Sequence, residues 1–215
     1  MGLFTLEHGK LAYAADFVLL GTACGLLAAA LVVWEPGDAG MRAGGLVLAG
    51  LATWTVIEYL VHRFALHGLQ PFRRWHAEHH RRPTALIGTP TVVSAGLVGL
   101  FVFSPAAALG GWWNAAAFTL GVSIGYLAYS ITHHALHHWH FRGAWFRARR
   151  RAHARHHGAV RSGSYGVTTV LWDQVFGSVA TAARVGAAGV AAFPSNTQQR
   201  SSSAEMPSAR TGRLK

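Results

Sequence analysis

The sequence is poor in carboxylates and nearly free of cysteine. Its 215 residues include 8 Asp and Glu against 19 Lys and Arg, which gives a formal net charge of +11. One cysteine, Cys24, cannot form an intramolecular disulfide framework, a Cys-based zinc finger or a thiolate-ligated iron–sulfur cluster. Charged residues make up 13% of the chain, whereas an average soluble domain has about 25%. The composition does not fit an ordinary soluble domain, and any bound metal must use ligands other than cysteine.

Charge is absent from long apolar segments. The 59 residues from Pro83 to Phe141 contain no Asp, Glu, Lys or Arg, and a helical membrane span needs about 20 residues. This segment therefore predicts two spans, joined by a hairpin turn within Ser104–Asn114, which contains a proline, a glycine pair and two tryptophans. Phe17–Trp34 and Arg42–Val61 predict two more spans, with an acidic turn at Glu35–Gly40 between them. We expect four membrane helices.

The arginines predict the orientation of these helices. Five lie within residues 63–82 and seven within 142–161, whereas the opposite loops contain only Arg42. By the positive-inside rule, both termini and both arginine-rich segments are expected in the cytoplasm. Anionic lipid headgroups account for such residues without a nucleic-acid partner, and we predict none.

The chain divides into two parts by composition. Residues 1–178 are expected to form one membrane-embedded domain. Its first apolar segment begins late and no small-residue cleavage site follows, so we interpret it as a retained helix and not as a signal peptide. Residues 179–215 are Ser-rich and polar towards their end and lack hydrophobic periodicity, which predicts a disordered C-terminal tail.

Histidine is the unusual abundance: 13 of the 14 histidines lie in two blocks near predicted cytoplasmic helix ends. In HAEHH (76–80) and HARHH (153–157), three histidines occupy positions i, i+3 and i+4, which are neighbours on one face of a helix. His133 and His137 also share a face. The five-residue step from His62 to His67 turns an ideal helix by about 140°, so a break is expected there.

Ten histidines are candidate metal ligands by this spacing, too many for one tetrahedral ion and suitable for two ions: His62, His67, His76, His79, His80, His133, His137, His153, His156 and His157. Imidazole binds iron, zinc, copper and nickel, so ligand type does not choose the metal. A carboxylate-bridged di-iron bundle needs four glutamates, and only Glu58, Glu78 and Asp173 lie near these blocks. Each of these carboxylates could orient a ligand histidine or pair with a nearby arginine.

The other four histidines are not expected to be ligands. His8 and His140 are isolated, which is typical of surface or satisfied polar residues. His134 and His138 lie on the other side of their helix from His133 and His137, where a supporting or surface role is expected.

Five motifs in register resemble the fatty acid hydroxylase superfamily, which includes sterol desaturases and carotenoid hydroxylases: HRFALH (62–67), HAEHH (76–80), HHALHH (133–138), HARHH (153–157) and YGVTTVLWDQVFG (165–177). The order is most similar to the fatty acid 2-hydroxylase branch. This resemblance implies an all-α, integral membrane four-helix domain with a cytoplasmic, helical, histidine-rich dimetal cap. It also implies that the ten histidines hold two iron ions, for which zinc can substitute, with the third motif open between His133/His137 and His134/His138.

The resemblance implies an O2-dependent hydroxylase acting on an aliphatic lipid, with position 2 of a fatty acyl chain favoured. No cytochrome b5-like segment occurs in the sequence, so an external electron donor and a separate redox partner are expected. A carotenoid hydroxylase or a lipid desaturase remains an alternative within the same chemistry. A histidine-rich metal transporter or sensor is an alternative of another class, but transport predicts ligands near the membrane midplane, and Pro83–Ile131 contains no histidine or charge. A bis-histidine haem carrier would need axial ligands on facing helices, whereas the histidines of this chain cluster at i, i+3 and i+4 on single helix faces.

Overall fold

The protein is helical throughout the residues that the structure describes, which are 7–34, 40–158 and 163–180 of a computed structural model. Within these ranges the one β-type pairing is an isolated bridge between Glu7 and Ile87. The helices are α1 (Lys10–Trp34), α2 (Gly40–Leu60), the π-helix η1 (Val61–Leu66), α3 (Phe72–Arg81), α4 (Thr91–Val98), the π-helix η2 (Gly99–Phe103), α5 (Ser104–Gly110), α6 (Trp112–His138), α7 (Ala144–Gly158) and α8 (Leu171–Val175).

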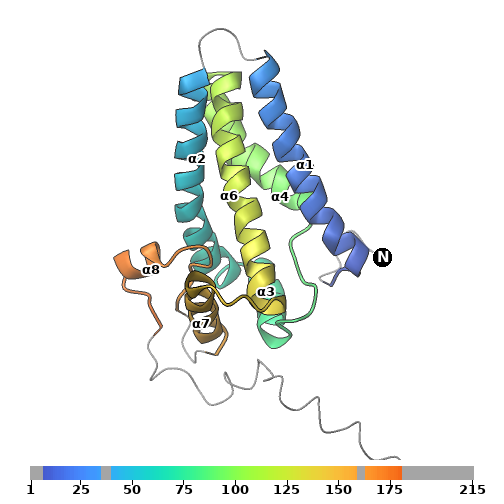
Figure 1. The fold of residues 1–215 in the computed structure, drawn as a ribbon, viewed down its shortest axis with the longest axis vertical. Helices are drawn as coiled ribbons and strands as arrows, with labels where there is room; N and C mark the ends of the chain where they lie inside the picture. The colour runs from blue at the N-terminus through green and yellow to red at the C-terminus, as the bar shows by residue number, and fades with distance from the viewer. Residues whose placement is uncertain (1–6, 35–39, 159–162, 181–215) are drawn as a thin grey trace, which may run out of the picture.

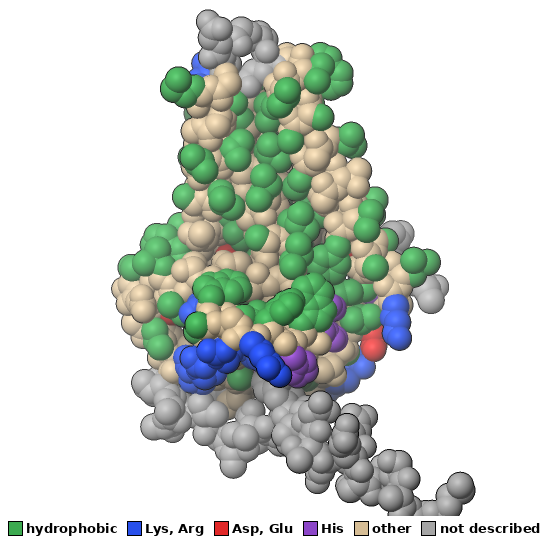
Figure 2. Space-filling model, in the orientation of Figure 1, with side chains coloured by type: hydrophobic (Ala, Val, Ile, Leu, Met, Phe, Trp, Pro, Cys, Tyr) green, Lys and Arg blue, Asp and Glu red, His purple; other side chains and the backbone are tan. Residues whose placement is uncertain are grey.

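Four helical segments are long and apolar enough to cross a membrane, which confirms the predicted number. They are α1, α2 continued by η1 (Gly40–Leu66), α4–η2–α5 (Thr91–Gly110), and α6. Many of their apolar side chains face outward, where lipid replaces the water that would otherwise penalise them. Figure 2 shows this hydrophobic surface over most of the length of the bundle. The chain is an integral membrane protein, and the cytoplasmic side of its two ends stays a prediction.

The structure corrects two span boundaries. The first helix begins at Lys10 and not at Phe17. The hairpin expected over Ser104–Asn114 is much shorter, because Ser104–Gly110 is helical and the chain reverses at Gly111, whose φ of 80° suits glycine. A π-helical turn and a hydrogen bond from the Ser104 hydroxyl to the Gly99 carbonyl precede Pro105, a local adjustment by which membrane helices accommodate proline. The predicted acidic turn lies outside the described residues except for Gly40, where α2 begins.

Helices α2 and α6 approach each other closely because glycines line their contact. A Cβ atom at Gly50 would overlap the Phe118 carbonyl oxygen, and one at Gly121 would overlap the Val47 carbonyl oxygen. Small residues allow this approach, and dispersion then holds the helices together where lipid gives no hydrophobic drive. These two helices form the closely packed centre of the bundle.

A cap of short elements lies at one end of the bundle (Figure 1). It consists of α3, α7, α8 and the connecting residues 163–170, which lie beside η1 and the C-terminal end of α6. The C-terminal end of α1 and the N-terminal end of α2 lie at the opposite end of the bundle (Figure 1). The predicted tail, 179–215, lies outside the described residues apart from Val179 and Ala180.

Candidate metal centre

The π-helix η1 brings His62 and His67 together. On an α-helix a five-residue step would separate them, and the sequence therefore predicted a break. The chain instead continues through a π-helical turn, whose i→i+5 hydrogen bonding places residues five apart above one another. The two imidazole centroids lie 5.4 Å apart. The helix ends at Leu66, and His67 is its C-cap residue.

Helices α3, α6 and α7 supply the other candidate ligands from single faces, as their spacing predicts. His76 and His79 of α3 are buried, as are His153 and His156 of α7, and these four point into the cap. His80 and His157, each four residues on, stack face to face with ring centroids 4.2 Å apart. His137 of α6 is also buried.

The ten histidines gather in two groups of five. The first group contains His62, His67, His76, His80 and His156, and the second contains His79, His133, His137, His153 and His157. In each group one nitrogen from every ring lies within 4.8 Å of all the others. Ligand nitrogens about 2.1 Å from one ion would lie roughly 3–4 Å apart. Both groups have the size of a metal site.

Close nitrogen pairs show where the rings point. In the first group, the Nε2 atom of His76 lies 3.0 Å from the Nε2 atoms of both His62 and His80. In the second group, the Nε2 atom of His153 lies 2.8 Å from that of His137 and 3.2 Å from that of His157. Electron-rich nitrogens facing one another in this way are the arrangement that a shared cation would stabilise.

Two hydrogen bonds fix the tautomer that ligation requires. The Nδ1 atom of His62 lies 2.5 Å from the Tyr165 carbonyl oxygen, and the Nδ1 atom of His156 lies 2.9 Å from that of Gly163. A carbonyl accepts, so each Nδ1 carries the proton and each Nε2 presents its lone pair to the group. The Nε2 atoms of His79 and His133 are buried without a hydrogen-bond partner among the described residues. These nitrogens lack the partner that a metal ion would provide.

Burial also keeps these imidazoles neutral. It lowers the pKa of His67 and of His79 to about 4, and that of His156 to about 3. For His76 and His153 burial lowers the pKa well below its ordinary value, and neighbouring histidines lower it further because two imidazolium charges would repel. Neutral imidazole is the form that binds metal. Together the donor set, its spacing and its protonation state fit metal ions.

The remaining histidines lie outside both groups. His134 and His138 stack on each other with ring centroids 4.3 Å apart, and His134 also contacts the ring of Tyr13. The geometry therefore supports the His133/His137 register of the third motif. His8 lies 3.4 Å from a carboxylate oxygen of Asp16. His140, in the loop before α7, lies 3.3 Å from the guanidinium of Arg150.

The three carboxylates predicted near the histidines differ in their surroundings. Glu58 is buried in α2 and accepts hydrogen bonds from the Val167 and Thr168 amides at 2.6 and 2.9 Å, and from the Thr168 hydroxyl. Asp173, fully buried in α8, accepts from the Tyr165 amide at 2.9 Å and the Gly166 amide at 2.7 Å. Both hold the segment 165–168, whose Tyr165 carbonyl accepts from His62.

Glu78 forms the arginine pairs that its sequence neighbours allow. Its carboxylate oxygens lie 2.5 Å from Arg81 and 2.6 Å from Arg82, which are at i+3 and i+4 at the C-terminal end of α3. Hydrogen bonding from Arg82 is the main cause that lowers the pKa of the Glu78 carboxyl. Among the described residues, none of the three carboxylates forms a hydrogen bond directly to a histidine of the two groups.

The backbone of residues 163–168 is the part of the site that sequence reasoning missed. Its carbonyls at Gly163 and Tyr165 accept the Nδ1 protons described above. Gly166 must be glycine, because a Cβ there would overlap the Thr169 carbonyl oxygen and lie 3.1 Å from Asp173 Oδ2. The motif YGVTTVLWDQVFG contains all of these residues except Gly163, but main-chain acceptors leave no side-chain pattern by which a sequence could reveal them.

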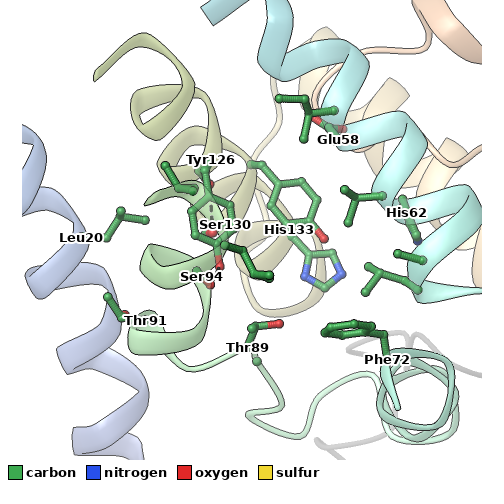
Figure 3. A pocket seen from close by; sticks show the side chains of 18 of the residues that line it. Leu20, Glu58, His62, Phe72, Thr89, Thr91, Ser94, Tyr126, Ser130 and His133 are labelled. Carbon is green, nitrogen blue, oxygen red and sulfur yellow. Dashed lines mark hydrogen bonds between the residues drawn. The ribbon is translucent and has the colours of Figure 1, made fainter. Parts of the chain in front are cut away.

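An apolar cavity of about 590 Å³ reaches both histidine groups from within the bundle. It is lined by His62 and His76 of the first group, by His79 and His133 of the second, and mainly by apolar and aromatic side chains of α1, α2, α4, η2 and α6. Figure 3 shows His62 and His133 on one side of the cavity and Leu20 and Thr91 on the other. The cavity thus joins the membrane-spanning helices to the candidate metal centre.

Proteins of similar sequence include the dihydroceramide fatty acyl 2-hydroxylase of Arabidopsis thaliana, which is 35% identical over 152 residues, 63% of this chain and 61% of the relative. The fatty acid 2-hydroxylase of Homo sapiens is 29% identical over 144 residues, covering 61% of this chain and 38% of the relative. The chain therefore spans less than two thirds of the length of either protein.

The fold and the family agree with the site. A solved structure described as full-length Scs7p, with only the hydroxylase domain visible, matches 84% of this chain and 70% of its own with a TM-score of 0.67 at 22% identity. That likeness shows a common fold. The sequence profile described as fatty acid hydroxylase matches residues 47–178, which include all ten clustered histidines. The chain belongs to the fatty acid hydroxylase family.

Proposed function

We propose that this protein is a membrane lipid hydroxylase that inserts one oxygen atom of O2 into the acyl chain of a fatty acid or of a lipid containing one. The balanced reaction is R–H + O2 + 2 e⁻ + 2 H⁺ → R–OH + H2O. One C–H bond is replaced by C–O–H, and the second oxygen atom leaves as water. Position 2 of the chain is the proposed carbon, because the relatives of similar sequence are named as 2-hydroxylases.

The single observation that carries this proposal is the cavity that touches both histidine groups. An aliphatic chain binds in an apolar cavity, and a cavity lined by membrane-spanning helices could take up a lipid from within the bilayer. Here apolar walls formed by spanning helices end at His62 and His76 on one side and at His79 and His133 on the other. A carbon at this end of the cavity would lie beside both groups at once.

The ten clustered histidines are proposed to hold two iron ions, five to each, and zinc can substitute because it also accepts imidazole. Bound iron supplies the oxidising chemistry that no side chain has, since an unactivated C–H bond resists every protein nucleophile and base. The chain's own residues would bind the metal ions and the lipid and orient them. The Tyr165 and Gly163 carbonyls hold His62 and His156 in their ligating tautomer, and the apolar wall positions the chain and excludes water.

Position 2 also fits the depth of the site. The histidine groups lie at the ends of the spanning segments, near the membrane surface, with the cap covering them. The carbon next to a lipid carboxyl or amide stays near that surface while the rest of the chain extends into the bilayer. We propose that this end faces the cytoplasm, as the arginine distribution predicts, and that a separate protein supplies the electrons.

The reaction is tested by expressing the protein in a host that lacks 2-hydroxylated lipids and supplying ¹⁸O2. We expect a 2-hydroxyacyl lipid with one labelled oxygen, measured by mass spectrometry. The His79→Ala variant should abolish the product. The control variant His134→Ala should retain it, because His134 lies on α6 outside both histidine groups. A labelled hydroxycarotenoid, or an alkene as the sole product, would contradict the proposal and favour another activity of the same chemistry.

A further inference from the structure

Helix α7 has two opposite faces of different chemistry. Its inner face carries His153, His156 and His157, which belong to the two histidine groups. Its outer face carries Arg147 and Arg151, which are one turn apart and exposed. At 100° per residue, the nine-residue step from Arg147 to His156 places the two side chains about 180° apart around the helix. One helix thus contacts the metal centre on one side and the solvent on the other.

The outer face has a positive charge that the described residues do not neutralise. The helix contains five arginines and no acidic residue in its 15 positions. Among the residues that the structure describes, ion pairs between arginine and carboxylate involve Arg81, the last residue of α3, and Arg82, its C-cap, and neither Arg147 nor Arg151 forms one. Arg147 donates a hydrogen bond to the Arg142 carbonyl oxygen, which leaves its charge uncompensated.

This face is turned away from the membrane. Trp145 lies in the first turn of α7 and has 57% of its surface exposed, and Phe141, in the loop before the helix, has 54% exposed. Exposed aromatic rings next to spanning helices mark the lipid–water interface. Arg147 lies about 200° round the helix from Trp145, so it faces the aqueous side. Figure 2 agrees, because basic side chains at the histidine end lie beyond a band of hydrophobic ones.

We propose that the arginine face of α7, formed by Arg147 and Arg151, is the docking surface for an acidic, soluble electron-carrier protein. This rests on the proposed function, which requires two electrons for each turnover. The face fits such a partner in three respects: its charge is complementary to an acidic carrier, it is open to the aqueous phase, and it belongs to a helix that holds residues of both histidine groups. An α-helix is about 10 Å across, so a carrier docked there has one helix between itself and the centre.

Charged residues at the rim of such an encounter mainly set its rate. Complementary charge raises association rates about 10- to 1,000-fold, and the gain falls with ionic strength. Reversing two charges on the face should therefore slow electron delivery about tenfold at low salt, with the difference shrinking as salt is added. The internal chemistry should be unaffected, because neither arginine touches a histidine of the groups in the described contacts.

The test uses the full-length, iron-loaded protein in lipid nanodiscs, with a plant-type [2Fe–2S] ferredoxin, its reductase and NADPH as the probe system. The variant Arg147→Glu/Arg151→Glu is compared with Arg42→Glu, an exposed arginine at the opposite end of the bundle. We expect the double variant to lose about tenfold in ferredoxin-supported turnover at low salt. We also expect Arg42→Glu and the charge-keeping variant Arg147→Lys/Arg151→Lys to retain the rate.

Two further measurements separate the possible failures. Single-turnover product formed with dithionite should be equal in all variants; a loss confined to the double variant would show that the face acts on the site itself and would overturn the docking proposal. Equal ferredoxin-supported rates in all variants would also overturn it. So would an effect seen in phosphatidylglycerol nanodiscs and missing in phosphatidylcholine ones, which would assign the face to the membrane.

Failure of the proposed function has a different signature. If the unchanged protein forms no hydroxylated lipid with either reductant, the hydroxylase assignment fails. Ferredoxin binding, titrated directly by calorimetry, then decides the docking proposal alone. Salt-sensitive binding that the double variant loses and Arg42→Glu keeps supports it, and equal binding by both refutes it.

Discussion

Asp173→Asn is the substitution that most directly tests how the cap holds its histidines. Asp173 has no exposed surface, and its two carboxylate oxygens accept from the Tyr165 amide, the Gly166 amide and the Ser178 hydroxyl, the last at 2.7 Å. Asparagine has the same shape but one acceptor oxygen. In the orientation that keeps more hydrogen bonds, the asparagine oxygen accepts from the Tyr165 amide and the Ser178 hydroxyl. The asparagine NH2 group then faces the Gly166 N–H, and neither of these two donors has an acceptor.

The cost follows from the hydrogen bonds lost. One charge-assisted bond disappears, a buried N–H is left without a partner, and the two remaining bonds lose their charge assistance, which together amounts to about 2–4 kcal/mol of folding free energy. For a chain of this size that lowers the thermal midpoint by roughly 5–15 °C. The Tyr165 carbonyl, which holds His62, should shift as well, and loss of such support weakens metal binding about 10- to 100-fold.

The assay is thermal unfolding in detergent micelles, combined with titration of the metal-free protein with iron or zinc. Glu78→Gln is the matched control, because it makes the same chemical change in a carboxylate that faces arginines and not the 165–168 segment. It should leave both the midpoint and the affinity unchanged. If Asp173→Asn behaves like this control, Asp173 does not support the site and the reasoning is wrong.

Three further predictions can be tested separately. Purified protein should hold about two metal ions per chain, and His156→Ala should lower that number whereas His134→Ala should not, as measured by elemental analysis. Gly121→Ala should destabilise the protein by about 1–3 kcal/mol in micelle unfolding, because its Cβ would overlap the α2 backbone, while Gly25→Ala, with nothing within 4 Å, should be neutral; equal midpoints would contradict the close packing. Reporter fusions at either terminus and within residues 35–39 should report opposite sides of the membrane, and agreement between them would refute the four-span topology.

Local periodicity made much of this molecule predictable. The histidines at i, i+3 and i+4 share a face in any α-helix, so the spacing within HAEHH and HARHH is enough to assign these motifs to inward faces. The same rule failed between His62 and His67, because the rule assumes α-helical geometry and η1 is π-helical. The hairpin turn is shorter than its sequence suggests for a related reason: Pro105 indicates a break, but a π-turn before it lets the helix continue to Gly110.

Long-range hydrogen bonding explains what could not be predicted. Glu78 could be paired with arginines from sequence, because its partners lie three and four residues away. Glu58 accepts from amides 109 and 110 positions distant, and backbone donors are the same at every residue. The sequence therefore left the same two roles open for all three carboxylates, orienting a ligand histidine or pairing with an arginine, whereas Glu58 and Asp173 organise a loop and Glu78 forms the arginine pairs.

The division of α3 and α7 between the histidine groups has a consequence for how metal is loaded. In α3, His76 and His80 belong to the first group and His79 to the second; in α7, His156 belongs to the first and His153 and His157 to the second. Each helix therefore contributes to both groups. If each group holds one ion, as proposed, the first ion would order both helices, and the second would bind ligands that are already ordered. We therefore expect metal uptake to be positively cooperative, so that chains with two ions and chains with none should outnumber chains with one.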